Sequence, residues 1–248
     1  MVGGFPLSLF ERIADVLDAD LDYDEERSGP APGHDPFADG EADLGWICST
    51  SFVDLSTRAA EPSIRIGGVA WVPDDVGSAG QPVYFGDVMS RTPADDLDAL
   101  AGRSIGCNDE VSLSGHYALR IALLERGHDP DTFAELTFTG GHRRSLEQVA
   151  AGNLDAAVID SVVRTDASRN DARIAKLHHI DRLGPWPTQP LVASTRLPEA
   201  QVAELRDALL ASNEDPAMQR ELANASLTKF VQVDADHYAP VRQALDRF

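Results

Sequence analysis

Two short stretches of this chain place small residues and hydrogen-bonding side chains where a strand is expected to pass into a helix. They read Ser112-Leu-Ser114-Gly115-His116-Tyr117 and Thr139-Gly140-Gly141-His142. At such a junction the backbone N–H groups and the positive end of the helix dipole face one point, an arrangement that binds anions. Ser112 or Ser114 could serve as a helix N-cap alone. The second turn, with its histidine, favours a ligand site.

Helical spacing of apolar residues follows both stretches. After the first, Tyr117, Ile121 and Leu124 share one face and Gly127 follows as a stop signal. After the second, residues 146, 149 and 150 share a face and residue 152 is a glycine. The pattern predicts two helices that begin at the two turns.

A third polar junction follows a short apolar run, residues 155–159, which is typical of a strand buried on both faces. Asp160 and Ser161 come directly after it. A fourth follows the expected strand 42–48, where the chain reads Ser49-Thr50-Ser51-Phe52. There the hydroxyls could bind a ligand beside an apolar wall, or the segment could be a plain connection from strand to helix.

The composition excludes some partners. The chain has 248 residues, 43% of them hydrophobic, and a formal net charge of −20. Such a charge repels nucleic acid and anionic membranes, so neither is an expected partner. An anion site must therefore be built locally, from dipoles, histidine and arginine.

Metal, disulfide and membrane signals are weak. Cys48 and Cys107 lie in apolar strand-like runs and are expected to be buried free thiols. Neither CxxC nor HExxH spacing occurs, so we expect no metal site and no cofactor. The sequence contains no apolar run of about 20 residues, and the residues after Met1 do not resemble a signal peptide. As it stands the sequence predicts a cytoplasmic protein, or an extracytoplasmic one if the start is misassigned or trimmed.

The other segments complete an α/β pattern with mostly parallel sheets. A capping box at Ser8 predicts a helix that runs to Leu21. The acidic, Gly- and Pro-rich segment 22–43 and the polar segment 166–173 are expected to be loops. Further predictions are a strand pair at 64–72 and 81–89 and closing helices at 198–212, 216–223 and 237–247.

The order of these motifs resembles the phosphate, phosphite and phosphonate substrate-binding proteins of ABC importers, which have the type 2 periplasmic-binding-protein fold. The resemblance rests on S-x-S-G at residues 112–115, G-G-H at 140–142 and G-x-L-D-A-A-x-x-D-S at 152–161, and it extends over about residues 5–210. Asp43-Leu-Gly-Trp-Ile and Pro82-Val-Tyr84-Phe-Gly-Asp87-Val are also similar. The chain departs from the family pattern at His116, where an aromatic residue usually follows the S-x-S-G motif, and at residues 1–4, which match the family's first strand only in truncated form.

This resemblance implies two lobes that close on a ligand: residues 1–85 with 190–248, and residues 86–189. It implies that the second lobe holds an oxyanion with Ser112, Ser114, Gly115, His116, Gly141 and His142, and that Asp160 binds a substituent or a P–OH proton. It implies that the first lobe supplies Ser49 and Thr50 as donors, with Phe52 and Tyr84 as walls. The implied partners are a small-molecule anion and an ABC permease.

Three functions remain open at this point. The residues favour a binding protein without covalent chemistry. The alternative is an enzyme on the same scaffold acting on a small carboxylate or phosphorylated metabolite, since Ser114, His142 and Asp160 are the residue types of a nucleophilic triad. However, Ser114 does not lie in a G-x-S-x-G elbow. A ligand-sensing module that acts on a partner protein is the third.

Overall fold

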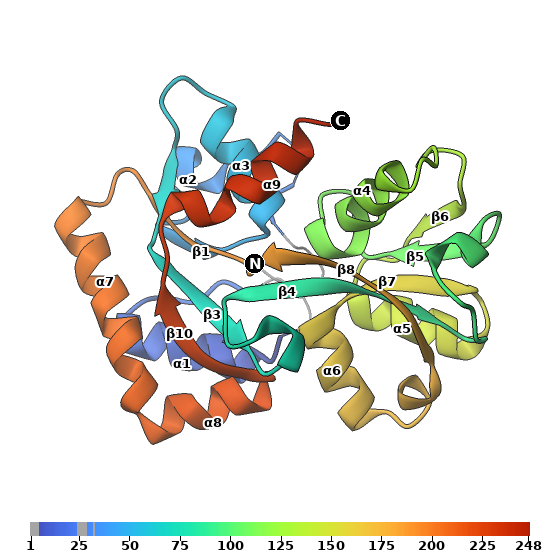
Figure 1. Ribbon diagram of the computed structural model, residues 1–248. Coiled ribbons are helices and arrows are strands. Elements are labelled where there is room, and N and C mark those ends of the chain that lie inside the picture. Colours follow the sequence, from blue (N-terminus) through green and yellow to red (C-terminus); the bar gives the residue numbers. More distant parts are fainter. Residues whose placement is uncertain (1–4, 24–28, 32) are drawn as a thin grey trace. The chain divides into compact units, whose positions relative to one another are not determined.

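The computed structural model describes residues 5–23, 29–31 and 33–248 (Figure 1). The chain divides into two compact units, of which unit 1 comprises Met1–Val83 and Pro187–Phe248 and unit 2 comprises Tyr84–Trp186. The sequence placed these boundaries at residues 85 and 190. The predictions for residues 1–4, and those for residues 24–28 and 32 of the segment 22–43, lie outside the described residues.

Unit 2 is built on a five-stranded sheet with strand order β6-β5-β7-β4-β8. Its strands are β4 (Val83–Ser90), β5 (Ser104–Cys107), β6 (Glu135–Phe138), β7 (Ala156–Asp160) and β8 (His178–Pro187). β5 runs parallel to β6 and β7, whereas β4 runs antiparallel to β7. The carboxyl ends of β5, β6 and β7 therefore lie at one edge, where the polar turns of the sequence begin.

Helices cover both faces of this sheet, as Figure 1 shows for α4 on one side and for α5 and α6 on the other. Alternate residues of β7 supply the two cores because successive side chains of a strand point to opposite faces. Ala156 and Val158 pack with residues of α4 (Ala118–Glu125). Ala157 and Ile159 pack with residues of α5 (His142–Ala151) and α6 (Ser161–Asn170).

Unit 1 contains two smaller sheets. One has strand order β1-β9-β2, made of β1 (Leu44–Trp46), β9 (Leu191–Ser194) and β2 (Ile64–Ile66), and the other pairs β3 (Val69–Pro73) with β10 (Leu227–Gln232). The rings of Trp46 and Trp71 stack within the core, with centroids 4.6 Å apart. The helices of unit 1 are α1 (Leu7–Leu17), α2 (Pro36–Asp39), α3 (Ser49–Thr57), α7 (Glu199–Ala211), α8 (Pro216–Asn224) and α9 (Ala239–Leu245).

Short 3-10 turns connect several elements: η1 (Val76–Ser78), η2 (Leu97–Leu100), η4 (Ile174–Lys176), η5 (Ser212–Glu214) and η6 (Ala235–Tyr238). Within the described ranges, we find no helix with the length and apolar character needed to cross a membrane.

The predicted α/β class is confirmed, but the expectation of mostly parallel sheets holds only for β6, β5 and β7. β9 runs antiparallel to both neighbours, and β3 and β10 are antiparallel as well. An apolar run indicates that a strand is buried, but whether it pairs parallel or antiparallel depends on neighbouring strands that can be distant in the sequence.

Three local predictions were also wrong. The segments 64–72 and 81–89 do not form a strand pair, because β2 pairs with β9, β3 pairs with β10, and β4 joins the sheet of unit 2. The polar segment predicted as a loop at 166–173 begins with the last residues of α6, which ends at Asn170. Ser8 does not cap α1, which ends at Leu17, and its hydroxyl donates to a carboxylate oxygen of Glu221 at 2.6 Å.

The closing helices are confirmed as α7, α8 and α9, with small shifts at their ends. Strand β10, between α8 and α9, was not predicted. Cys48 and Cys107 are buried free thiols, as expected.

Candidate anion-binding site

The first polar turn begins at Ser112, which is the N-cap of a π-helical turn, η3 (Leu113–Tyr117), that continues into α4. The Ser112 hydroxyl oxygen accepts a hydrogen bond from the Gly115 amide at 3.2 Å. Ser114 is buried, and its hydroxyl has no hydrogen bond to any residue in the described part of the chain. Ser112 therefore stabilises the turn, whereas the Ser114 hydroxyl remains available for a ligand.

Two glycines allow this turn to pack closely on its neighbours. A Cβ atom at Gly115 would lie 2.0 Å from Asn108 Oδ1 and 2.9 Å from His142 Cε1. A Cβ atom at Gly86, in β4, would lie 2.6 Å from the Ser114 carbonyl oxygen. Only glycine fits at either position, and the close contact brings the first turn against the first residue of α5.

Asn108 was missed by the sequence analysis. It follows β5 directly and is buried, and its Nδ2 donates to Asp109 Oδ2 at 3.0 Å. Its backbone carbonyl accepts from the Gly140 amide at 2.8 Å, so this residue contacts both polar turns. A polar residue at the carboxyl end of a predicted parallel strand is the signal that could have identified it.

The second turn is organised by Thr139 and two glycines. The Thr139 hydroxyl lies 2.6 Å from the Ser145 hydroxyl oxygen and also donates toward backbone carbonyls. Gly140 has φ +87°, a conformation that favours glycine. Gly141 is the N-cap of α5, and no side chain caps the helix there. A Cβ atom at Gly141 would meet no atom within 4 Å, so the space before the uncapped helix start is open.

The side chain of His142 is buried and neutral. It is 7% exposed, and its Nδ1 accepts a hydrogen bond from the Asp160 backbone amide at 3.3 Å. Burial lowers the pKa of His142 to about 3. The ring is therefore uncharged at neutral pH, although a backbone hydrogen bond with Val158 acts against the effect of burial on this pKa. His142 therefore brings no positive charge to a ligand.

Asp160 is the N-cap of α6. Its Oδ1 accepts from the amides of Val162 (2.8 Å) and Val163 (3.3 Å), and the residue is 1% exposed. The contact between His142 and Asp160 uses the Asp160 amide, while its carboxylate bonds to α6. The Asp160 carboxylate therefore serves as the cap of α6.

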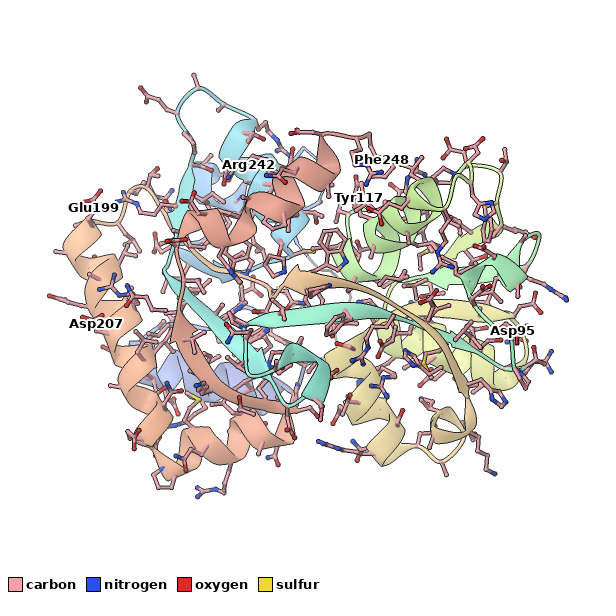
Figure 2. The ribbon with its side chains drawn as sticks, viewed as in Figure 1. Asp95, Tyr117, Glu199, Asp207, Arg242 and Phe248 are labelled. Carbon is pink, nitrogen blue, oxygen red and sulfur yellow. The ribbon has the colours of Figure 1, made fainter. Side chains whose placement is uncertain are left out.

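His116 occupies the place of the expected aromatic residue. Its Nδ1 lies 2.7 Å from the Glu110 carbonyl oxygen, and its ring lies edge-on to Phe138 at 5.1 Å and near Tyr117 at 5.3 Å. Figure 2 labels Tyr117, the last residue of the turn that leads into α4. Burial lowers the pKa of His116. Because a carbonyl can only accept, Nδ1 carries the proton, and Nε2 of the neutral ring is an acceptor.

In unit 1, three predicted residues lie together at the start of α3. Ser49 is fully buried, and its hydroxyl donates to the Pro187 carbonyl at 3.3 Å. The Thr50 hydroxyl donates to Cys48 Sγ at 3.2 Å. Phe52 packs edge-on against Tyr238, with centroids 5.2 Å apart. Both hydroxyl protons are used inside unit 1, so a ligand here would meet hydroxyl lone pairs and backbone amides.

Tyr84 is the first residue of unit 2 and lies in β4, 1% exposed. The structure thus brings Ser112, Ser114, Gly115, Gly141, His142 and Asp160 together in unit 2, with His116 at the edge of the first turn, and Ser49, Thr50 and Phe52 together in unit 1.

A buried ion cluster in unit 2 was also missed. Asp87 of β4 is 0% exposed and accepts from Arg164 Nε of α6 and Arg182 Nε of β8, both at 2.7 Å, with His179 Nε2 at 3.2 Å. Burial alone would raise the pKa of Asp87, but the hydrogen bonds from His179 and Arg182 outweigh it and hold the pKa below its usual value. The cluster fastens α6 and β8 to β4 and thereby supports the framework of the candidate site.

The charges of the chain are distributed unevenly. Unit 2 carries 11 of the 21 Lys and Arg residues but only 16 of the 41 Asp and Glu residues. The unit with the two polar turns is therefore much less acidic than unit 1. Within the described ranges, His, Cys, Asp and Glu do not gather in a group that could hold a metal ion.

Comparison with known proteins gives one family match. The sequence profile described as "ABC transporter, phosphonate, periplasmic substrate-binding protein" matches residues 34–238. A search of curated protein sequences finds no significant match.

Solved structures share the fold at low sequence identity. A binding-protein component of an ABC phosphonate transporter from Pseudomonas aeruginosa is 18% identical, with a TM-score of 0.77 over 96% of this chain and 78% of that chain. PhnD1 from Prochlorococcus marinus, in complex with methylphosphonate, is 17% identical, with a TM-score of 0.75 over 96% and 90%. The aliphatic sulphonate binding protein SsuA from Escherichia coli is 17% identical, with a TM-score of 0.59 over 86% and 72%.

Proposed function

Because the chain belongs to the family of periplasmic substrate-binding proteins of phosphonate ABC transporters, we propose that it binds a small phosphonate- or phosphate-like anion. The fold is that of the type 2 periplasmic binding proteins, as the sequence predicted. In this proposal unit 2 holds the oxyanion with Ser114 and with the start of α5 at Gly141 and His142, while Ser112 and Gly115 shape the turn that presents Ser114. Unit 1 contributes the start of α3, with Ser49, Thr50 and Phe52.

The packing of the two polar turns against each other carries this proposal. His142, the first residue of α5, lies against Gly115 in the turn that starts α4, so two helix starts are adjacent. The Ser114 hydroxyl and the uncapped amides of α5 are available there, beside the neutral ring of His142. Donors and helix dipoles of this kind stabilise an anion even in an acidic protein.

The arrangement supports binding rather than catalysis. A serine nucleophile needs a base, and a histidine whose pKa is about 3 is a poor base at neutral pH. The Asp160 carboxylate caps α6, and the contact of Asp160 with the His142 ring is made by its backbone amide. We therefore propose a binding protein. If the chain were an enzyme, ³¹P NMR would show turnover of a bound phosphorus ligand; for a binding protein we expect the ligand to remain unchanged.

The family assignment implies a small-molecule ligand and a transporter permease as partners. Proteins of this family are periplasmic, so of the two locations considered from the sequence we propose the extracytoplasmic one. We propose that His116, whose Nε2 is a hydrogen-bond acceptor, favours a ligand with a protonated oxygen or an N–H group.

The test is calorimetric titration of the purified protein with methylphosphonate, aminoethylphosphonate, phosphate and sulfate. We expect micromolar or tighter binding of at least one phosphorus oxyanion. At 1 mM, such a ligand stabilises the folded chain by about 4 kcal/mol, which thermal unfolding detects readily. Absence of binding by all the phosphorus anions would refute the proposal.

Two serine variants locate the site. Ser114→Ala removes a hydroxyl with no hydrogen bond in the described structure, so we expect unchanged unfolding of the free protein and at least tenfold weaker binding. Ser112→Ala removes an N-cap and should cost about 1 kcal/mol of stability. Wild-type affinity in Ser114→Ala would remove this turn from the site.

A further inference from the structure

The hydroxyl of Tyr238 is a buried polar group with no hydrogen-bond partner among the described residues. Tyr238 ends η6 and is 0% exposed. Burial raises the pKa of the phenol, so it stays protonated and can donate. A buried donor without an acceptor destabilises a folded protein, and such groups in native structures usually mark a functional role or an unseen partner.

Its ring lies beside the proposed ligand-binding part of unit 1. Tyr238 packs edge-on against Phe52 of α3 at 5.2 Å. Phe52 is three residues after Ser49, so the two side chains lie on neighbouring positions of the helix surface. The phenol therefore lies near the first turn of α3, whose residues we assign to the ligand.

Hydrogen bonds join the segment around Tyr238 and the start of α3 to Pro82 and Pro187, at the ends of the two segments that make up unit 1. His237 Nε2, next to Tyr238 in sequence, lies 3.1 Å from the Pro82 carbonyl oxygen. The same oxygen accepts from the Thr188 amide at 2.9 Å, and the Ser49 hydroxyl donates to the Pro187 carbonyl. Pro82 precedes Val83, where the first segment of unit 1 ends, and Pro187 is the residue at which its second segment begins. The His237 contact thus holds the segment that contains Tyr238 close to Pro82.

We propose that the Tyr238 hydroxyl is a further ligand-binding group, which donates a hydrogen bond to an oxygen of the anion at the start of α3. This inference rests on the proposed function. A phenol that donates to a charged oxygen makes a short, strong hydrogen bond and needs no positive charge. Such a donor suits a unit in which acidic residues greatly outnumber basic ones.

The test compares calorimetric titrations of methylphosphonate and phosphate into the wild type, Tyr238→Phe and Tyr23→Phe. For Tyr238→Phe we expect at least tenfold weaker binding of the preferred anion, because one hydrogen bond to a charged group is lost. Thermal unfolding of this variant without ligand should be unchanged or shifted upward, since no hydrogen bond within the protein is removed. Tyr23→Phe removes a bond to the Phe5 carbonyl at 2.7 Å, so it should unfold at a lower temperature and bind normally.

Each outcome separates this inference from the proposed function. Wild-type affinity in Tyr238→Phe overturns the inference and leaves the proposed function intact. A loss of stability in Tyr238→Phe equal to that in Tyr23→Phe shows a partner within the protein and also overturns it. Failure of the wild type to bind any phosphorus anion overturns both.

Discussion

Replacing Gly115 by alanine tests whether the two polar turns pack as the structure describes. The new methyl group would lie 2.0 Å from Asn108 Oδ1 and 2.9 Å from His142 Cε1, well inside van der Waals contact. Asn108 is buried and its Nδ2 is bonded to Asp109, so it cannot move aside without losing that bond. Overpacking of this kind costs about 1–3 kcal/mol. For a chain of this size the melting temperature should fall by roughly 2–12 °C.

Gly141→Ala is the matched control, because its methyl group would meet no atom within 4 Å and its φ of 177° is open to any residue. We expect its stability to stay within about 0.5 kcal/mol of the wild type. If the anion lies before α5, this methyl group should weaken binding of methylphosphonate. Thermal unfolding without ligand and calorimetry with ligand separate the two effects. A Gly115→Ala protein with wild-type melting temperature and affinity would refute the packing of the turns.

Three further predictions concern the neighbouring residues. Because the folded pKa of His142, about 3, lies below its unfolded value of about 6.5, its contribution to stability is complete above pH 6.5 and is lost as the pH falls toward 3. His142→Gln should therefore flatten the dependence of unfolding free energy on pH in that window, measured by denaturant titration. Asp160→Ala should lower stability by about 1–2 kcal/mol, whereas Asp160→Asn, which keeps a cap, should unfold almost as the wild type; equal losses would contradict the capping role. Burial raises the pKa of Cys107 to about 12, so a thiol reagent at pH 8 should leave it unmodified in the native protein and label both Cys107 and Cys48 in denaturant.

Local structure at the candidate site followed from the sequence. An N-cap at Ser112 or Ser114, a helix that starts at the second polar turn and the buried strand β7 were all predicted from residue types and spacing, and the structure has the cap at Ser112. These features depend on hydrogen bonds and dihedral angles within a few residues, which the neighbouring side chains largely determine. The family also followed from the order of the motifs, because each motif is short and contiguous.

The partners of buried polar side chains did not follow from the sequence. Asp160 was expected to bind a ligand, and its second role, the cap that its Oδ1 provides for α6, was not predicted. His142 was expected to contact an oxyanion. In the structure its Nδ1 accepts from the amide of Asp160, the last residue of β7, and its ring is neutral. The ion cluster at Asp87 joins residues that are 77 and 95 positions away from it.

The sequence by itself determined where helices and strands begin at the polar turns, and which turns could bind an anion, because backbone hydrogen bonding and side-chain capping act over short distances. The tertiary structure alone decided the antiparallel direction of β4 and β9, the close contact of Gly115 with Asn108 and His142, and the neutral state of that histidine. These properties depend on which distant segments exclude water from a residue and supply its hydrogen-bond partners, and no local pattern specifies those segments.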